Sequence, residues 1–370
     1  MLVQPGNDGL DVQGRLIANA AAGQEIHFDP ADPASAWSGI SIVGTDIQPS
    51  TGNVLNYVSI TKGGIDGYCN LYVSYGDVSV TNSQLDGGLD SGVCLDTGSS
   101  LTMTASQLTN NQRYAMDVID ASAQFTLDNM SASGNLSDTI GIEGGFMSGV
   151  HTWSTSGIDT YDLFYNYMTI VPTGTLNIEP GVTVLFGLTR VITVKGTLTA
   201  LGTPTDPILF TGETPTPGLW GGLTFTGTPE QHAVGRFAYT TIEYGGYSAS
   251  AMVSAENADI SFSHCILRHS AGDAIEVWPD GSLASLPVNP LASQPVRVNC
   301  SSLHDISGYA IQNLSAQTVL AAYNWWGAAS GPTADDNPGG TGSTITGLVR
   351  YRPYLASLDC KFIFMPLTFK

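Results

Sequence analysis

The stretch ITVKGTLTALGTPTDPILFTGETPTPGLWGGLTFTGT, residues 192–228, decides the fold because it has an earlier counterpart in the chain. That counterpart is LDVQGRLIANAAAGQEIHFDPADPASAWSGISIVGT, residues 10–45. The match continues from LNYVSITKGG, residues 55–64, to FAYTTIEYGG, residues 237–246. The chain therefore contains two copies of one long unit, in which Val12 of the first copy corresponds to Val194 of the second. Self-similarity at a fixed offset is the sequence signature of repeat architectures.

A shorter period recurs inside each copy. The pattern VSVTNSQL, residues 78–85, returns one coil later as LTMTASQL, residues 101–108, and in the second copy as ISFSHCIL, residues 260–267. Its apolar residues alternate over three to five positions, which is strand periodicity. One such coil cannot bury its inward side chains alone, whereas coils stacked at about 4.8 Å bury a continuous core.

These patterns predict an all-β fold, a right-handed parallel β-helix with coils of about 22–24 residues and three short strands in each coil. Val80, Met103 and Phe262 are expected in its interior. A ladder of small residues is expected at one bend, formed by Ser83, Ser106, Cys265 and Ser301. An antiparallel sandwich is the alternative, because it also has many short strands. It does not explain a repeat with matching positions, and Asn-Gly hairpin turns are missing from the sequence.

Composition excludes several classes of function. Twelve basic residues stand against 32 acidic ones, a net charge of −20, which is opposite to what nucleic acid or an anionic membrane surface requires. No run of about 18 apolar residues is present, so no membrane insertion is expected. Residues 1–25 do not resemble a signal peptide, so an exported form is expected to have lost a leader.

Two stretches carry a resemblance to a known family. The first is MTIVPTGTLNIEPGVTVLFGLTRVITVKGTLTALGTPTDPILFTG, residues 168–212, and the second is NWWGAASGPTADDNPGGTGSTITGLVRYRPYL, residues 324–355. They resemble the opening coils and the closing motif of bacterial secreted proteins with right-handed parallel β-helix repeats. The closing-motif positions are Asn324, Trp325, Trp326, Gly327, Gly331, Pro332 and Pro353. The resemblance implies the fold and secretion to the extracellular space or the cell surface. It does not imply one function, because the family includes adhesins, matrix proteins and polysaccharide enzymes.

Three segments follow from the repeat. Residues 1–157 form the first unit, which starts mid-coil because the strand equivalent to residues 168–180 is missing before it. Residues 158–355 form the second unit with the closing motif. Residues 356–370 form an apolar tail that we expect to add as a strand to a neighbouring subunit.

The five cysteines predict disulfides. Cys69 and Cys94 are separated by about the length of one coil, and Cys265 and Cys300 by one coil plus an insertion. Both pairs are expected on neighbouring coils near bridging distance, in an oxidising compartment. Buried free thiols are the alternative, and zinc bound by Cys265, His269, Cys300 and His304 is a weaker one. Cys360 is left over, either free or linked to another chain.

The sequence contains no recognisable catalytic motif and no cofactor-binding motif. The richest acidic stretch, LDGGLDSGVCLDTG, contains Asp86, Asp90 and Asp96, which could bind Ca²⁺, although a solvated acidic turn is the simpler interpretation. Aromatic residues near insertions could stack on sugars or pack under long loops; these are Trp153, Tyr161, Tyr165, Tyr167 and Trp278.

Two functions follow from these patterns. The first is a non-enzymatic structural protein of a bacterial surface, matrix or filament that assembles end to end with copies of itself. Its assembly candidates are Cys360, Phe362, Phe364, Leu367 and Phe369. The alternative is a protein that binds or cleaves extracellular polysaccharide, either as a lyase or as a glycoside hydrolase.

Overall fold

The computed structural model describes residues 2–3, 9–67, 69–279, 296–358 and 360. Within these ranges the chain is built almost entirely of short strands, with two 3-10 helices, η1 (Ile65–Gly67) and η2 (Tyr247–Ala249). It divides into two compact units, Met1–Thr199 and Ala200–Lys370. Compactness places this division later than the repeat does, and the segments expected from the repeat stay a prediction.

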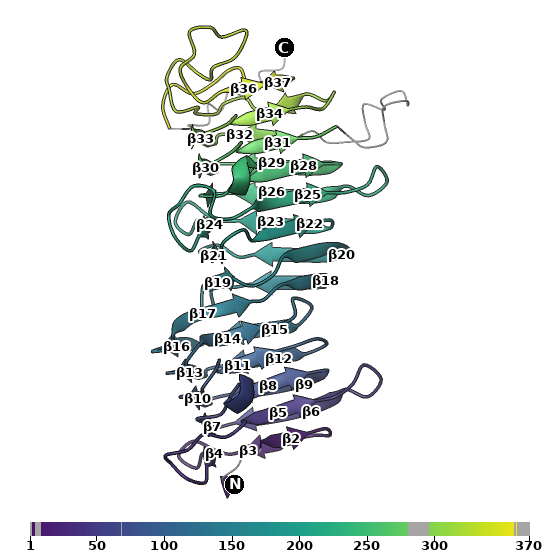
Figure 1. Cartoon of the computed structure of the whole chain (residues 1–370), viewed down its shortest axis with the longest axis vertical. Helices are drawn as coiled ribbons and strands as arrows, with labels where there is room; N and C mark the ends of the chain where they lie inside the picture. The colour runs from purple at the N-terminus through teal and green to yellow at the C-terminus, as the bar shows by residue number, and fades with distance from the viewer. Residues whose placement is uncertain (1, 4–8, 68, 280–295, 359, 361–370) are drawn as a thin grey trace, which may run out of the picture. The chain divides into compact units, whose positions relative to one another are not determined.

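Unit 1 contains three stacks of parallel strands (Figure 1). The first is β1 (Leu2–Val3), β4 (Ile26–Pro30), β7 (Val58–Thr61), β10 (Gln84–Asp86), β13 (Gln107–Thr109) and β16 (Ser131–Ser133). The second is β2 (Leu10–Val12), β5 (Ile40–Val43), β8 (Leu71–Ser74), β11 (Val93–Leu95), β14 (Tyr114–Val118), β17 (Ser137–Ile142), β19 (Thr160–Leu163) and β21 (Thr183–Phe186). The third is β3 (Ile17–Asn19), β6 (Ser50–Asn56), β9 (Gly76–Thr81), β12 (Ser100–Thr104) and β15 (Gln124–Asp128). Beyond these come β18 (Gly145–Trp153), β20 (Met168–Ile178) and β22 (Val191–Val194). The boundary between the units falls within β23 (Thr197–Leu201).

Unit 2 also has three rows of strands. The first is β24 (Ile208–Gly212), β27 (Thr240–Glu243), β30 (Ile266–Ser270) and β33 (Ser302–Ile306). The second is β25 (Gly222–Thr226), β28 (Val253–Glu256), β31 (Ile275–Val277), β34 (Ile311–Asn313) and β36 (Ile345–Thr346). The third is β26 (Ala233–Ala238), β29 (Ala258–Ser263), β32 (Arg297–Asn299), β35 (Val319–Leu320) and β37 (Val349–Arg350).

The predicted fold class, a β-helix with three short strands in every coil and a near-constant coil length, is wrong. The strands belong to parallel sheets of six, 12, five and 14 strands. Strands three places apart in the chain pair up to β17, but β17 pairs with β19 and β19 with β21, only two places apart. The repeat length also varies, because much less chain separates the paired Ile140 and Tyr161 than separates the paired Ile266 and Ser302.

Strand length explains the irregular centre of the chain. β18 and β20 have nine and 11 residues, and each occupies the place of two short strands and the bend between them. Where the register is described, the strand pairs run parallel, so the antiparallel sandwich is wrong as well.

The predicted interior positions are confirmed. Val80, Met103 and Phe262 have no exposed surface. In unit 1 one row of paired inward side chains runs through the second stack, from Ile42 to Phe186, and none of its members is more than 2% exposed. Phe210, Ile242, Leu267 and Leu303 form the equivalent row of unit 2. Burial of such rows is the main source of stability in a chain with so few helices.

Small polar residues satisfy the backbone at the bends, as expected. The Ser83 hydroxyl accepts a hydrogen bond from the Val58 amide, and the Ser106 hydroxyl accepts one from the Ser83 amide. In unit 2 the Ser301 hydroxyl accepts one from the Cys265 amide at 3.0 Å. These three buried N–H groups thereby each find an acceptor on a neighbouring coil of the chain.

Candidate functional site

Two disulfides join distant parts of the chain. Cys69 and Cys94 are paired, with 5.8 Å between their Cα atoms, as their spacing predicts. The predicted Cys265–Cys300 bridge is wrong, because Cys300 pairs with Cys360 and Cys265 is a buried free thiol. Cys360 is therefore neither free nor left for another chain. The error arose because 60 residues separate Cys300 from Cys360, and no repeat relates the two.

The three candidate calcium ligands lie apart in separate turns. Asp86 accepts hydrogen bonds from the Thr109 hydroxyl and from the side-chain Nδ2 of Asn110, whereas Asp96 accepts one from the Tyr72 hydroxyl at 2.6 Å. Asp90 accepts one from the Ser91 amide. Protein donors thus occupy each carboxylate, and the clusters of metal-ligating groups among the described residues do not unite them.

The four candidate zinc ligands are not gathered either. His269 stacks on Tyr244, and His304 Nδ1 lies 2.7 Å from Asp305. The thiol of Cys265 is buried, whereas Cys300 is held in its disulfide. The zinc site expected as the weaker alternative, with these four residues as ligands, is therefore wrong.

The aromatic candidates divide clearly. Trp153 on β18 and Tyr161 on β19 are buried and stack on each other with their centroids 4.7 Å apart, so they pack in the core of unit 1. Tyr165, Tyr167 and Trp278 are exposed, by 61%, 60% and 45%. The remaining assembly candidates, Phe362, Phe364, Leu367 and Phe369, lie outside the described residues.

Three carboxyl groups in unit 1 surround Arg113, and we call the four residues the Arg113 cluster: Arg113, Asp90, Asp117 and Glu143. Arg113 Nη1 lies 2.9 Å from Asp117 Oδ2 and 3.6 Å from Asp90 Oδ1, and its Nη2 lies 3.4 Å from Glu143 Oε1. The Asp117 side chain has no exposed surface. Burial raises the pKa of Asp117 to about 7, against the opposing effect of Arg113, and the neighbouring carboxylates raise it further.

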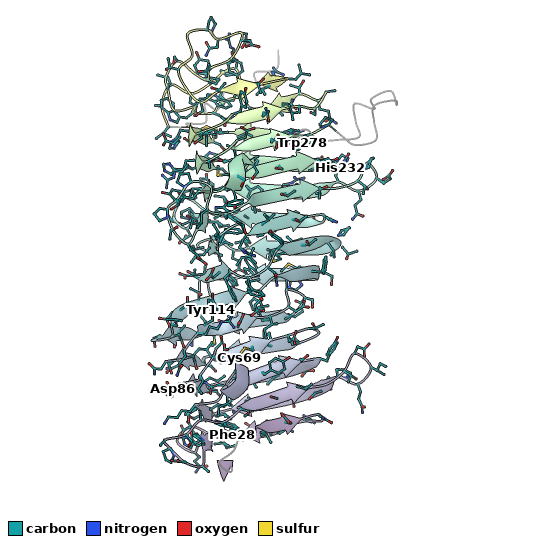
Figure 2. The ribbon with its side chains drawn as sticks, viewed as in Figure 1. Phe28, Cys69, Asp86, Tyr114, His232 and Trp278 are labelled. Carbon is teal, nitrogen blue, oxygen red and sulfur yellow. A yellow bond between two sulfur atoms is a disulfide. The ribbon has the colours of Figure 1, made fainter. Side chains whose placement is uncertain are left out.

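The strand pattern explains how this cluster forms. Asp117 lies between the inward Met116 and Val118 on β14, so its side chain faces outward. The equivalent position on β17 is Gly141, where an added Cβ would stand 2.8 Å from the Tyr114 ring and 3.0 Å from Phe164. That missing side chain lets the Tyr114 and Phe164 rings meet over the sheet in a tilted contact, with their centroids 4.8 Å apart. The Arg113 guanidinium covers both rings (Tyr114 is labelled in Figure 2).

A second pair of carboxyl groups lies in unit 2, beside a tryptophan and a glutamine. We call these four residues the Trp278 site: Asp273, Glu276, Trp278 and Gln312. Glu276 on β31 is paired in register with Gln312 on β34, and both side chains face outward while Ile275 and Ile311 face the core. With its side-chain amide oriented so that the nitrogen faces the two carboxyl groups, Gln312 donates to Asp273 Oδ2 and to Glu276 Oε1, each at 3.0 Å. Two oxygens bonded to one nitrogen lie within about 6 Å of each other.

Trp278 directly follows β31 and adds a ring to this site (Figure 2). Its indole Nε1 donates to Glu276 Oε2 at 3.1 Å, which holds the half-exposed ring beside the carboxylate. Asp273 is fixed from the other side, where its Oδ1 accepts from the Tyr309 amide at 2.7 Å. Gly308 is required there, because a Cβ would stand 2.2 Å from Asp273 Oδ1.

The pKa values of the two carboxyl groups of the Trp278 site are raised, as is that of Asp117 in unit 1. Burial raises the pKa of Asp273, and the Tyr309 amide opposes this. Burial also raises the pKa of Glu276, and the nearby charge of Asp273 adds to the effect. Asp273, Glu276 and Gln312 are half-buried rather than enclosed, so a ligand resting on Trp278 can reach them.

Sequence reasoning missed the carboxylates of both groups except Asp90. A signal was present, because Asp117 and Glu276 each interrupt a short apolar strand, in YAMDV and in IEV. An acidic residue between two inward-facing apolar residues must lie on the outer face of the sheet. What the sequence does not contain is the identity of the neighbours, most of which come from other turns of the chain.

None of the helices in the described ranges is long and apolar enough to cross a membrane. The two disulfides are consistent with an oxidising environment. Comparison with protein-family models, with curated proteins and with solved structures found no match to this chain.

Proposed function

We propose that this chain is a secreted, extracellular protein that binds neutral polysaccharide at the Trp278 site. The observation that carries the proposal is the 45% exposed Trp278 ring, hydrogen-bonded to one of two carboxylates that Gln312 joins. The two disulfides support the extracellular location, because disulfides persist outside the cell and are rare in the cytosol.

The chemistry of the site fits a sugar ring. One face of a pyranose presents C–H groups, which pack on an indole, and its edge presents hydroxyls that donate hydrogen bonds. A carboxylate has about four acceptor positions, so Glu276 and Asp273 keep acceptor capacity beyond the bonds from Trp278, Gln312 and Tyr309. Trp278 is held before binding, so little side-chain entropy is lost when a sugar stacks on it.

Charge selects among polysaccharides. The net charge of −20 and the two carboxylates of the site repel polyanions such as polyuronates. The proposal is therefore restricted to neutral chains. It is also restricted to binding, because protein donors already bond all four carboxylate oxygens of Asp273 and Glu276.

A matched pair of variants tests the proposal. Trp278→Ala removes the ring, and we expect it to weaken binding to a neutral glucan, xylan or mannan by about tenfold or more, since buried aromatic anchors dominate such contacts. Tyr247→Ala is the control, because Tyr247 is an equally exposed aromatic residue of unit 2, at 43%. Affinity electrophoresis through gels containing each polysaccharide measures the difference. Equal retardation of both variants and the wild type, or no retardation of the wild type in any gel, contradicts the proposal.

End-to-end assembly into a surface or matrix structure stays a prediction. It depends on residues 361–370, which lie outside the described part of the chain. Light scattering of the full chain and of a chain lacking residues 361–370 tests it. A concentration-dependent rise in mass that the deletion abolishes supports assembly, and unchanged monomer mass for both contradicts it.

A further inference from the structure

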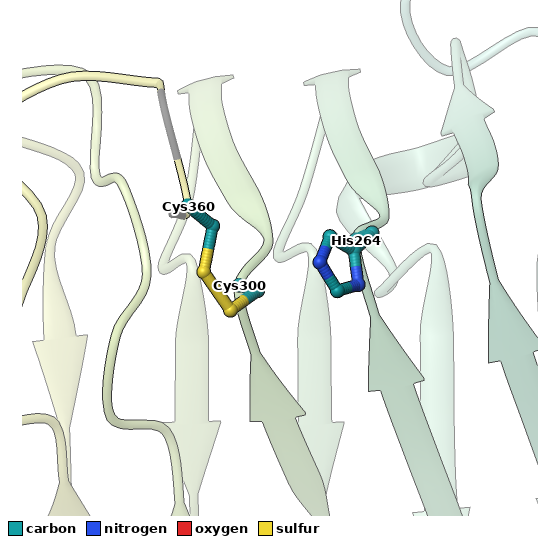
Figure 3. Close-up of side chains that lie close together, drawn as sticks. All are labelled: His264, Cys300 and Cys360. Carbon is teal, nitrogen blue, oxygen red and sulfur yellow. A yellow bond between two sulfur atoms is a disulfide. The ribbon is translucent and has the colours of Figure 1, made fainter. Parts of the chain in front are cut away.

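One histidine and one disulfide of unit 2 come together where two turns meet. The ligand atoms of His264, Cys300 and Cys360 all lie within 4.8 Å of one another, and the three residues are half-buried (Figure 3). His264 and Cys300 occupy equivalent turn positions, because Ser263 and Asn299, which precede them, are paired in register. Both have a left-handed backbone, with φ of 56° and 49°. Cys360 reaches the same place from the segment that follows the last strand.

The His264 ring is held in place by its surroundings. It stacks on Tyr239 with the centroids 4.8 Å apart, and its Nδ1 lies 2.9 Å from the Ser263 hydroxyl. A hydrogen-bonding partner on one ring nitrogen fixes the orientation of an imidazole whose other nitrogen binds a metal.

Open space adjoins the three groups. A pocket of about 370 Å³ is lined by His264, both cysteines and Trp325, among other residues. A tetrahedral ion held by three protein ligands needs room for a fourth, such as water, and this pocket provides it.

We propose that reduction of the Cys300–Cys360 disulfide turns this place into a zinc site of two thiolates and one imidazole. An external dithiol supplies two electrons and two protons, is itself oxidised to a disulfide, and leaves two thiols. Zn²⁺ then displaces one proton from each thiol and binds both sulfurs at about 2.3 Å and the imidazole nitrogen at about 2.0 Å. The sulfurs separate on reduction, which Cys360 permits because it lies outside any strand. This inference is independent of polysaccharide binding.

The other disulfide provides an internal contrast. Cys69 and Cys94 are 0% and 2% exposed, and the third group near them is Asp90, which is already committed to Arg113. A dithiol cannot reach these sulfurs in the folded unit. Mild reduction is therefore expected to open Cys300–Cys360 alone.

Cobalt(II) provides the test, because thiolate bound to cobalt absorbs in the near ultraviolet. The whole chain is reduced with dithiothreitol, freed of it under nitrogen and titrated with Co²⁺ and then Zn²⁺. We expect one Co²⁺ per reduced chain, displaced by Zn²⁺, and none bound by the oxidised chain. His264→Ala should weaken binding at least about tenfold. His269→Ala is the control, because His269 stacks on Tyr244 in the same manner, with ring centroids 5.1 Å apart, at the next turn position of the chain.

Two further measurements close the test. Circular dichroism after reduction must show the strands intact. A Cys300→Ser, Cys360→Ser double variant, shown by the same measurement to be folded, must not bind Co²⁺. The proposal is overturned if the reduced wild type unfolds, if it shows no thiolate–cobalt band, or if the His264 and His269 variants bind equally.

Discussion

The Arg113 cluster of unit 1 and the Trp278 site of unit 2 both combine carboxyl groups with aromatic rings, but we expect only the Trp278 site to bind a ligand. Each places carboxylates on the outer face of a parallel sheet, and burial raises the pKa of Asp117 in one and of Glu276 in the other. In unit 1 Asp117 has no exposed surface, and it is covered by the Arg113 guanidinium, which lies over the tilted pair of Tyr114 and Phe164 rings. In unit 2 the aromatic residue stands beside the carboxylate, and Trp278 is 45% exposed.

This difference teaches that a perturbed carboxylate alone does not identify a binding site. Perturbed pKa values are found in structural ion-pair networks as well as in functional sites. Asp117 has no exposed surface and cannot meet a ligand without displacing Arg113, so we expect its cluster to stabilise unit 1 rather than to bind. Glu276 can meet one without any displacement, so its site is available for binding.

The largest expected effect is a loss of stability when the guanidinium of the Arg113 cluster is removed. Arg113→Met leaves Asp117 buried with no opposite charge, and we expect the free energy of unfolding of unit 1 to fall by about 3 kcal/mol at pH 8. This is the lower end of the range for a broken buried pair, because the Arg113 side chain is itself 36% exposed. Urea unfolding followed by circular dichroism measures it.

Arg15→Met is the control for this substitution, because Arg15 is an exposed arginine of unit 1 whose guanidinium donates to the Gly52 carbonyl. It should change stability by no more than about 0.5 kcal/mol. A loss as small as that of Arg15→Met in the Arg113 variant would show that the cluster does not stabilise unit 1.

A smaller effect is expected from the titration of Asp117. Its folded pKa of about 7 lies above the ordinary value of 3.8, so the folded chain holds a proton that the unfolded chain has released between these pH values. This group therefore makes the free energy of unfolding fall as the pH rises from about 4 to 7, by at most about 1.4 kcal/mol per pH unit. Asp117→Asn should flatten this slope, as measured by urea unfolding at pH 5, 6 and 7. An unchanged slope in the Asn variant would show that Asp117 ionises normally.

The sequence predicts which side chains face the core far better than it predicts the contacts among side chains on the outer faces of the sheets. Alternating apolar residues place Val80, Met103 and Phe262 in the core without any knowledge of their neighbours, because burial depends on the local pattern. The serine ladder is predictable for the same reason, since a repeat carries each serine to the next turn.

Contacts that leave the repeat could not be predicted. β18 and β20 are long because no bend forms where other parts of the chain bend between two short strands. No residue in these strands indicates that the bend is missing. The prediction of a regular three-strand coil was therefore wrong. Cys360 lies beyond the last repeat, so periodicity could not assign its partner, Cys300. The Arg113 cluster depends on the absence of a side chain at Gly141, and a single glycine among 43 gives no signal.

The smallest expected effect is a change in polysaccharide binding at the Trp278 site as the pH falls. The Arg113 cluster, which we do not expect to bind, has no such effect. If Glu276 and Asp273 accept hydrogen bonds from a sugar, protonation removes acceptors, and the raised pKa of both groups brings this about at a higher pH than for an ordinary carboxyl group. Polysaccharide binding by the wild type should therefore weaken a fewfold, on the order of 1 kcal/mol or less, as the pH falls from 7 to 5. Glu276→Gln keeps the shape of the side chain and a carbonyl acceptor for Trp278, so it should bind a fewfold more weakly at pH 7 and respond less to pH. Affinity electrophoresis at pH 5, 6 and 7 compares the two. Should the Gln variant show the same pH response as the wild type, Glu276 takes no part in binding, and Trp278 would act as an isolated exposed ring.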